Sequence, residues 1–344
     1  MNQDNSGDTH ETPDDQGRDV LGELIQVAGR RPSPSASHYE QTFAATHAIW
    51  QRKVRATRQR QRVFAVAASI AILAIGIGAI LRFAPDTPLP PIASAVIVQG
   101  DVAVFSPATG TWAPVTEPGF GLGAGDRLRT ESDGRAAFTL GDAISVRLDS
   151  ASDLMFTSES ELELIAGIVY IDSGPGDQAG TVEIETAHGV LQDIGTQFEV
   201  ATMTDNLRVR VREGLVKLFQ AEQVLAFEGK AGEEFSVDPS GTIRQISFSP
   251  YDPAWSWAEA LAASPDVEGM PVLEFLNWVA RETGREIQFD GRNVQLAAGS
   301  AILHGSAQSL TPMEALEVML ATTNFVYSLD TSGTIIISRR SISR

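Results

Sequence analysis

The sequence predicts a multi-domain, single-pass membrane protein. It combines an all-β sandwich or jelly-roll-like domain, a small C-terminal α/β domain and a short helical segment at the N-terminus. Three observations predict this organisation: one apolar run is long enough to cross a bilayer, a long central stretch alternates apolar and polar residues, and the remainder mixes helical and strand patterns. A chain of 344 residues has room for two domains and additional segments.

The membrane segment is the run from Val63 to Leu81, which contains no charged residue. As a helix it spans roughly 28 Å, close to the hydrocarbon thickness of a bilayer. Six Lys and Arg residues lie at 52–62, whereas only Arg82 follows the run closely. The positive-inside rule therefore places the N-terminus in the cytoplasm and the rest of the chain beyond the membrane. A cleaved signal peptide is the alternative, but the preceding leader is too long for one. We assign residues 63–83 to a transmembrane helix.

The cytoplasmic segment, residues 1–62, begins with a polar stretch that has the composition of disordered chains. Two helical patterns follow, and Phe43 and Trp50 lie seven residues apart in the second. Two helices bury little core alone, so this segment is either loosely structured or binds a partner through these aromatic side chains. After the membrane, residues 84–94 are rich in proline and predict an extended stalk.

Residues 95–248 have the period-two pattern of a β domain, with turn residues about every ten positions. Three similar stretches, AVIVQGDVAV, LELIAGIVYI and VRVREGLVKL, align on Gly100, Gly167 and Gly214. Each copy changes strand phase at its glycine, which favours a tight turn or a bulge with positive φ. We expect structural turns at these glycines and at the Gly195–Thr196 pair.

The last part comprises a linker, residues 249–270, and an α/β domain, residues 271–344. MPVLEFLNWVARETG predicts an amphipathic helix with Gly284 as its C-cap, and EIQFD predicts a short strand. In LTPMEALEVMLATTN, Thr311 is the expected N-cap and Glu314 completes a capping box. A hairpin follows. Two helices on a short sheet are the expected arrangement.

The sequence shows no pattern of catalytic residues. The histidines lack metal-ligand spacing, and neither a G-x-S-x-G elbow nor a phosphate-binding G-x-x-x-x-G-K occurs. There is no cysteine, so disulfides and thiolate chemistry are excluded. The net charge of −18 lies almost entirely beyond residue 84 and argues against nucleic-acid binding. We therefore predict no enzyme activity, no cofactor and no metal.

One stretch leaves two interpretations open. Arg208, Arg210 and Arg212 share one face of a predicted strand, and His188 lies upstream. The three arginines could bind an anion, or they could pair across strands with Glu199. Pairing is the simpler explanation and the one we favour.

The β region resembles the FecR-domain family. The resemblance rests on Gly189, Ile194-Gly195-Thr196, Phe198 and the run from Val209 to Gly214, preceded by Gly125-Asp126 and Leu140-Gly141. The C-terminal region is similar to the small secretin-and-TonB N-terminal (STN) domain. That likeness rests on Thr283-Gly284, the stretch from Gly305 to Leu316 and the closing hairpin.

The FecR resemblance implies a regulator in the bacterial inner membrane. Such a protein senses the signalling domain of an outer-membrane transducer, or another periplasmic protein, and acts on an extracytoplasmic-function sigma factor in the cytoplasm. Phe43 and Trp50 are then the candidate contacts for the sigma factor. The alternative, from a different class, is a periplasmic scaffold or envelope-binding protein for which the N-terminal part is only an anchor.

Overall fold

In the computed structural model, the described residues are 27, 90–141, 143–174, 181–220 and 224–340. The predicted transmembrane run, Phe43 and Trp50 lie outside these residues. Within the described part of the chain, no helix is both long enough and apolar enough to cross a membrane. Residues 88–344 form one compact unit, in which the β domain and the C-terminal part contact each other.

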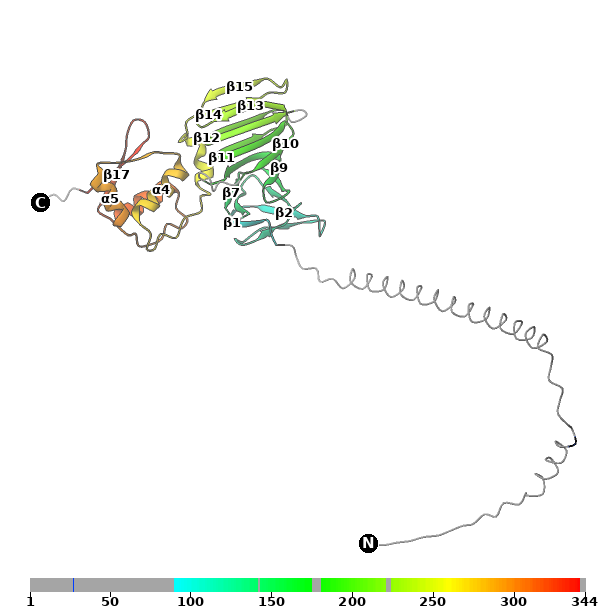
Figure 1. The fold of residues 1–344 in the computed structure, drawn as a ribbon, viewed down its shortest axis with the longest axis horizontal. Coiled ribbons are helices and arrows are strands. Elements are labelled where there is room, and N and C mark those ends of the chain that lie inside the picture. The colour runs from blue at the N-terminus through cyan, green and yellow to red at the C-terminus, as the bar shows by residue number, and fades with distance from the viewer. Residues whose placement is uncertain (1–26, 28–89, 142, 175–180, 221–223, 341–344) are drawn as a thin grey trace, which may run out of the picture. The chain divides into compact units, whose positions relative to one another are not determined.

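The all-β prediction for the central region is confirmed, because the described residues between 93 and 247 form strands and connecting turns and no helix (Figure 1). The strands are β1 (Ala93–Gln99), β2 (Val102–Ser106), β3 (Thr111–Pro114), β4 (Gly121–Leu122), β5 (Arg127–Thr130), β6 (Arg135–Leu140), β7 (Ile144–Leu148), β8 (Asp153–Phe156), β9 (Glu161–Asp172), β10 (Glu183–Thr186), β11 (Gly189–Thr202), β12 (Leu207–Gln220), β13 (Val224–Lys230), β14 (Glu233–Val237) and β15 (Ile243–Ser247).

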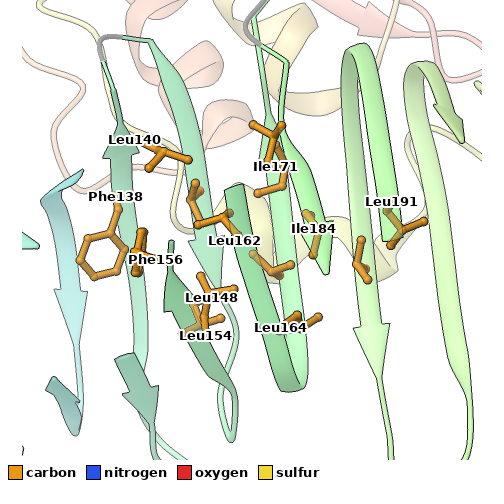
Figure 2. Close-up of a cluster of buried hydrophobic side chains, with 14 of the residues drawn as sticks. Phe138, Leu140, Leu148, Leu154, Phe156, Leu162, Leu164, Ile171, Ile184 and Leu191 are labelled. Atoms are coloured by element: carbon orange, nitrogen blue, oxygen red, sulfur yellow. The ribbon is translucent and has the colours of Figure 1, made fainter. Parts of the chain in front are cut away.

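These strands belong to one hydrogen-bonded network rather than to two sheets joined only by loops. The main path runs β15-β14-β12-β11-β10-β9-β7-β6-β1-β4, and β2, β3, β5, β8 and β13 branch from it. Figure 1 shows β9 to β15 side by side, with β11 and β12 as the longest of them. The network folds around a single apolar core, part of which is seen in Figure 2, where leucine, isoleucine and phenylalanine side chains of β6 to β11 meet.

The repeat glycines mark the places where strands change partner. Gly100 lies in the turn between β1 and β2, as predicted for a turn. Gly167, Gly195 and Gly214 lie inside β9, β11 and β12 and have positive φ, which agrees with the bulge alternative of the prediction rather than with a tight turn. Before Gly214, β12 pairs with β14, and after it β12 pairs with β13. Gly214 has φ 81° and lies opposite the bulge at Gly195–Thr196 of β11, and the irregular backbone there accompanies the change of partner.

Gly195 and Thr196 form part of one such irregularity. The pairing of β11 with β12 shifts register between Ile194 and Gln197, and Gly195 has φ 63°. Thr196 is buried, and its hydroxyl donates to Asp193 Oδ2 at 3.0 Å. The pair is therefore a fixed bend in the middle of a long strand.

Replacing Gly214 by valine should destabilise a purified fragment of residues 88–344 by ~1–3 kcal/mol. Gly214 has φ 81°, and a Cβ there would lie 2.6 Å from the Gly195 carbonyl oxygen. Gly241 is the matched control, because its φ is 80° but nothing lies within 4 Å of the added Cβ. Urea denaturation should show a larger loss for Gly214→Val than for Gly241→Val. Equal losses would mean that close packing at the bend is unimportant.

The C-terminal part contains the predicted helices and hairpin together with one helix that was not predicted. Its elements are α4 (Val272–Thr283), β16 (Ile287–Phe289), α5 (Arg292–Ser300), α6 (Pro312–Ala321), β17 (Phe325–Leu329) and β18 (Ile335–Arg339). Gly284 caps α4 in the left-handed conformation, and Thr311 and Glu314 form the predicted capping box of α6. The sheet order is β16-β18-β17, and the helices and sheet enclose a separate apolar core.

The expected linker is also structured. Residues 249–270 contain the short helices η2 (Pro253–Trp255) and α3 (Ser256–Glu259). Trp255 is completely buried, against Tyr170 and Phe248. This segment packs on the β domain and leads directly into α4, so it joins the two cores of the compact unit.

Candidate functional site

The candidate site lies on the face of the β sheet opposite the core. Direct cross-strand partners place Arg147 beside Tyr170, Tyr170 beside Glu199, Glu199 beside Arg210, and Arg210 beside Glu234. Paired residues of adjacent strands project to the same side. These five residues, which we call the polar row, therefore cross β7, β9, β11, β12 and β14 on one face.

The residues next to the polar row along each strand project to the opposite side of the sheet. This accounts for the alternation of apolar and polar residues in the sequence of these strands. Val146, Ile171, Phe198 and Val211 are likewise direct cross-strand partners, and all four are fully buried in the apolar core. The sheet thus has one apolar face, and its other face carries arginines, a tyrosine and glutamates. A polar face of this kind is normally solvated, yet much of this one is covered.

The cover is formed by Phe248 to Ala262, which we call the docking segment. The Trp255 ring meets Tyr170 edge-on, with 5.9 Å between ring centroids. Trp257 Nε1 donates a hydrogen bond of 2.9 Å to Glu199 Oε2, and Arg210 stacks over the Phe248 ring at 4.2 Å. Aromatic rings over guanidinium groups bury apolar area while keeping the charges paired.

The arginine prediction is confirmed in part. Arg208 and Arg210 both bond Glu199 Oε1, at 3.1 and 3.3 Å, as cross-strand pairing predicts. Arg212 does not join them. Its Nε donates to the Pro250 carbonyl and its Nη1 to the Glu282 carbonyl, each at 2.7 Å, and its Nη2 bonds Glu259 at 2.6 Å. Arg212 therefore connects the β domain to the docking segment and to the end of α4.

Arg147 is the second buried arginine of this interface. It is 1% exposed; its Nη1 donates to the Ala258 carbonyl at 2.8 Å and its Nη2 to Glu282 at 2.9 Å. Burial lowers the pKa of Arg147, but the Glu282 carboxylate and the neighbouring Tyr170 and Asp172 outweigh this and raise it above its ordinary value. The guanidinium is thus charged, and Arg147 and Glu282 form a buried ion pair between strand β7 and helix α4.

A third ion pair lies at the edge of the interface. Arg281 of α4 binds both carboxylate oxygens of Asp172 on β9, and Gln197 donates to Asp172 Oδ2 at 2.8 Å. Arg281 also reaches Glu213 Oε2 at 3.2 Å. We call Arg147, Arg212 and Arg281 the bridging arginines, because each bonds residues on the other side of the interface.

Close approach at the end of α4 completes the interface. A Cβ on Gly284 would lie 2.2 Å from the Pro250 carbonyl oxygen and 2.9 Å from Arg212 Nε. Gly284 therefore has two functions: it ends α4 in the left-handed conformation, and it leaves room for Pro250 and Arg212 beside the helix terminus.

Asp172→Asn should weaken the interface in a pH-dependent way. Burial raises the pKa of Asp172, but hydrogen bonding to Arg281, the charge of Arg281 and the Gln197 bond outweigh it and hold the pKa below its ordinary value. A carboxyl group with a lowered folded-state pKa stabilises the protein above about pH 4, and this stabilisation is lost as the pH falls through the folded-state value.

The measurement is urea denaturation of residues 88–344 between pH 7 and pH 2. We expect Asp172→Asn to lower the free energy of unfolding by about 1–3 kcal/mol at pH 7. Below about pH 4, the free energy of unfolding should fall less steeply with pH than in the unaltered fragment. Asp205→Asn, at an exposed turn position, is the control. An acid profile identical to that of the unaltered fragment would show that the Asp172–Arg281 pair contributes nothing.

The other predicted functional residues do not gather here. His188 lies outside this interface, with its Nε2 at 3.5 Å from the Met203 carbonyl oxygen. Phe43, Trp50, Val63 and Leu81 are outside the described residues. Among the described residues, no group of three or more His, Cys, Asp or Glu side chains is placed to hold a metal ion.

Sequence reasoning missed most of the interface: Arg147, Asp172, Trp255, Trp257, Arg281 and Glu282. One signal was present, because the segment AWSWAEALA places two tryptophans in a short stretch that was expected to be a linker. Large aromatic side chains seldom occur in pairs in an exposed linker, so this composition indicates packing.

This architecture defines a class: an all-β domain with a structured segment and a small α/β part docked on its polar face. Comparison of sequences adds that residues 126–217, the middle of the β domain, match the FecR protein family. The resemblance inferred for the β domain is thus supported, whereas that of the C-terminal part to STN domains stays a prediction. No curated protein matches the chain.

Two solved structures share some similarity. Both are crystal structures, at 2.50 and 1.65 Å resolution, of a candidate anti-sigma factor from Parabacteroides distasonis. Each is 16% identical, covers 62% of this chain and 99% of the other, and has a TM-score of 0.33. Similarity at this level is too low to support an argument about fold or function.

Proposed function

We propose that the protein is a single-pass signal-relay regulator of the inner membrane. Its C-terminal part receives a periplasmic protein, and its cytoplasmic segment acts on an extracytoplasmic-function sigma factor. The observation that carries the proposal is the FecR match of residues 126–217, inside a β domain to which the C-terminal part is firmly docked. The uncharged run from Val63 to Leu81, with basic residues on one flank, supports the membrane topology.

The docking interface has a mechanical consequence for a relay. Buried ion pairs and the Trp255 cluster join the β domain to α4. A displacement of the C-terminal part is therefore transmitted to the β domain. A signal that must pass through one membrane helix requires a rigid connection between the two parts. A freely tethered C-terminal domain would move without displacing the helix. The bridging arginines supply this connection in the proposed relay.

The receiving surface that we propose is an edge of the C-terminal sheet. In the described part of the chain, β16 and β17 each pair only with β18, so both outer edges have unpaired backbone groups. Leu329 at the end of β17 is 48% exposed. An extended segment of the periplasmic partner, which we propose to be the signalling domain of an outer-membrane transducer, would add to such an edge as a further strand.

The topology is tested by reporter fusions in bacterial cells. Alkaline phosphatase, active only in the periplasm, should be active when fused after Arg344 and inactive when fused after Gln51. A reporter that requires the cytoplasm should show the opposite pattern. Deleting Val63 to Leu81 should abolish phosphatase activity of the Arg344 fusion, because the segment that we propose to cross the membrane would be missing. The reverse pattern for the two fusion sites would refute the proposed function.

A further inference from the structure

A cleft of about 820 Å³ lies beside the docking interface and is lined by residues from both sides of that interface. Gln197 and Glu213 come from the β domain, Tyr251 from the docking segment, and Arg281 and Arg285 from the end of α4 and the residues after it. Small-molecule sites often have this size and occupy the junction between two structural parts. The volume is therefore sufficient for an organic ligand or a short peptide segment.

The cleft contains side chains of both charges. Three arginines line it, Arg212, Arg281 and Arg285, together with two glutamates, Glu213 and Glu286. Carboxylates at the interface pair with Arg212 and Arg281 and neutralise them. A guanidinium without such a partner can attract an anion at short range, even on a chain whose net charge is −18.

The three arginines are not equivalent. Arg212 and Arg281 are both paired with carboxylates across the interface. The Arg285 side chain has a single hydrogen bond among the described residues, from Nη1 to the Gly333 carbonyl at 2.8 Å, and no carboxylate of this part of the chain pairs with it. Its other N–H groups are free to donate.

Arg285 is also held in position. Its guanidinium lies 5.0 Å from the centroid of the Tyr251 ring, and the Gly333 bond fixes one end of the group. A guanidinium that is stacked and anchored loses little conformational freedom when it binds a ligand. Its planar donors match the two oxygens of a carboxylate, so the pair is frequently bidentate.

We propose that this cleft binds a carboxylate group through Arg285, with Tyr251 and Ala280 forming the apolar side of the site. The carboxylate belongs either to a small organic acid or to an acidic peptide segment. Such a ligand would contact the docking segment, α4 and the β17–β18 turn together, and would therefore favour the docked arrangement. The proposal does not depend on the regulator function, because it rests on the cleft and on Arg285 alone.

The test is isothermal titration calorimetry on the purified full-length protein in detergent at constant ionic strength. The probes are succinate and a capped hexapeptide of alternating glutamate and leucine. We expect saturable binding of at least one probe, weakened about tenfold or more in Arg285→Gln because a charge-assisted bidentate pair is lost. Arg292→Gln, an exposed arginine outside the cleft, should bind as the unaltered protein does.

A second measurement detects binding in the unaltered protein, so its result does not depend on whether Arg285→Gln folds. In the unaltered protein, the side-chain Nε–Hε nuclear magnetic resonance signal of Arg285 should shift on addition of the bound probe. Binding of succinate alone supports a small organic acid, and binding of the peptide alone supports a protein segment. Absence of binding by both probes, or equal binding by Arg285→Gln and the unaltered protein, would overturn the proposal.

Discussion

Arg212→Ala should be the most destabilising single substitution in the interface. It should lower the free energy of unfolding of a fragment of residues 88–344 by about 3–5 kcal/mol. The Arg212 side chain is 1% exposed and bonds Pro250, Glu259 and the last turn of α4. Removing it leaves the Glu259 carboxylate and two carbonyl groups without this partner beside a buried tryptophan. The penalty of uncompensated buried polar groups then adds to the loss of the bonds.

Arg208→Ala is the matched control, because Arg208 lies on the same strand, is 28% exposed and, among the described residues, has Glu199 as its one side-chain partner. The free energy of unfolding should fall by less than about 1 kcal/mol in Arg208→Ala, as for other partly exposed ion pairs. Tryptophan fluorescence reports Trp255 and Trp257 when Trp112 and Trp278, the other tryptophans of the fragment, are replaced by phenylalanine in both variants and in the reference. We expect the tryptophan signal of Arg212→Ala to change at lower urea than the β-sheet signal by circular dichroism. An unchanged midpoint would contradict the bridging role of Arg212.

The double substitution Phe43→Ala, Trp50→Ala should abolish capture of the sigma factor without preventing membrane insertion. The two aromatic residues lie seven apart in a helical pattern that has little core of its own to bury them. Buried aromatic anchors commonly supply 2 kcal/mol or more of binding energy each, so losing both should weaken binding by about a thousandfold or more. Mass spectrometry of proteins retained by the tagged chain measures the effect.

Substitution of Gln51 and Gln59 by alanine is the control, since it changes polar residues of the same segment. Equal recovery of a sigma factor by the aromatic double variant and the unaltered chain would remove the cytoplasmic half of the proposal. An envelope scaffold with a simple N-terminal anchor would then be the better explanation.

Local signals in the sequence predicted the elements whose formation depends on neighbouring residues. Gly284 and the Thr311–Glu314 capping box ended and began helices where expected, since capping acts within one turn. The period-two pattern predicted the all-β domain for the same reason. Helix α5 was missed because GRNVQLAAGS has a weak apolar pattern and an uncapped start at Gly291.

The docking interface could not be predicted in this way because its partners are distant in the sequence. Arg147 and Glu282 are separated by 135 positions, and Arg212 and Glu259 by 47. Glu199 pairing with Arg208 and Arg210 was predictable from adjacent strands, whereas the same reasoning failed for Arg212. Arg212 has no cross-strand partner in β11, because Gln197 faces Glu213 and Phe198 faces Val211. Its side chain instead bonds Pro250, which lies next to Gly284, and no local periodicity encodes that contact.

Transcript profiling of cells that carry the chain without residues 1–50 is the most direct test of the central claim, that a periplasmic signal is relayed to a cytoplasmic sigma factor. The altered chain keeps the basic residues 52–62 and the run from Val63 to Leu81, so its insertion is checked in parallel by the phosphatase fusion. We predict that one sigma-factor regulon changes and no longer responds to the periplasmic signal. Unchanged transcription, with the chain inserted and the periplasmic part folded, would contradict the relay.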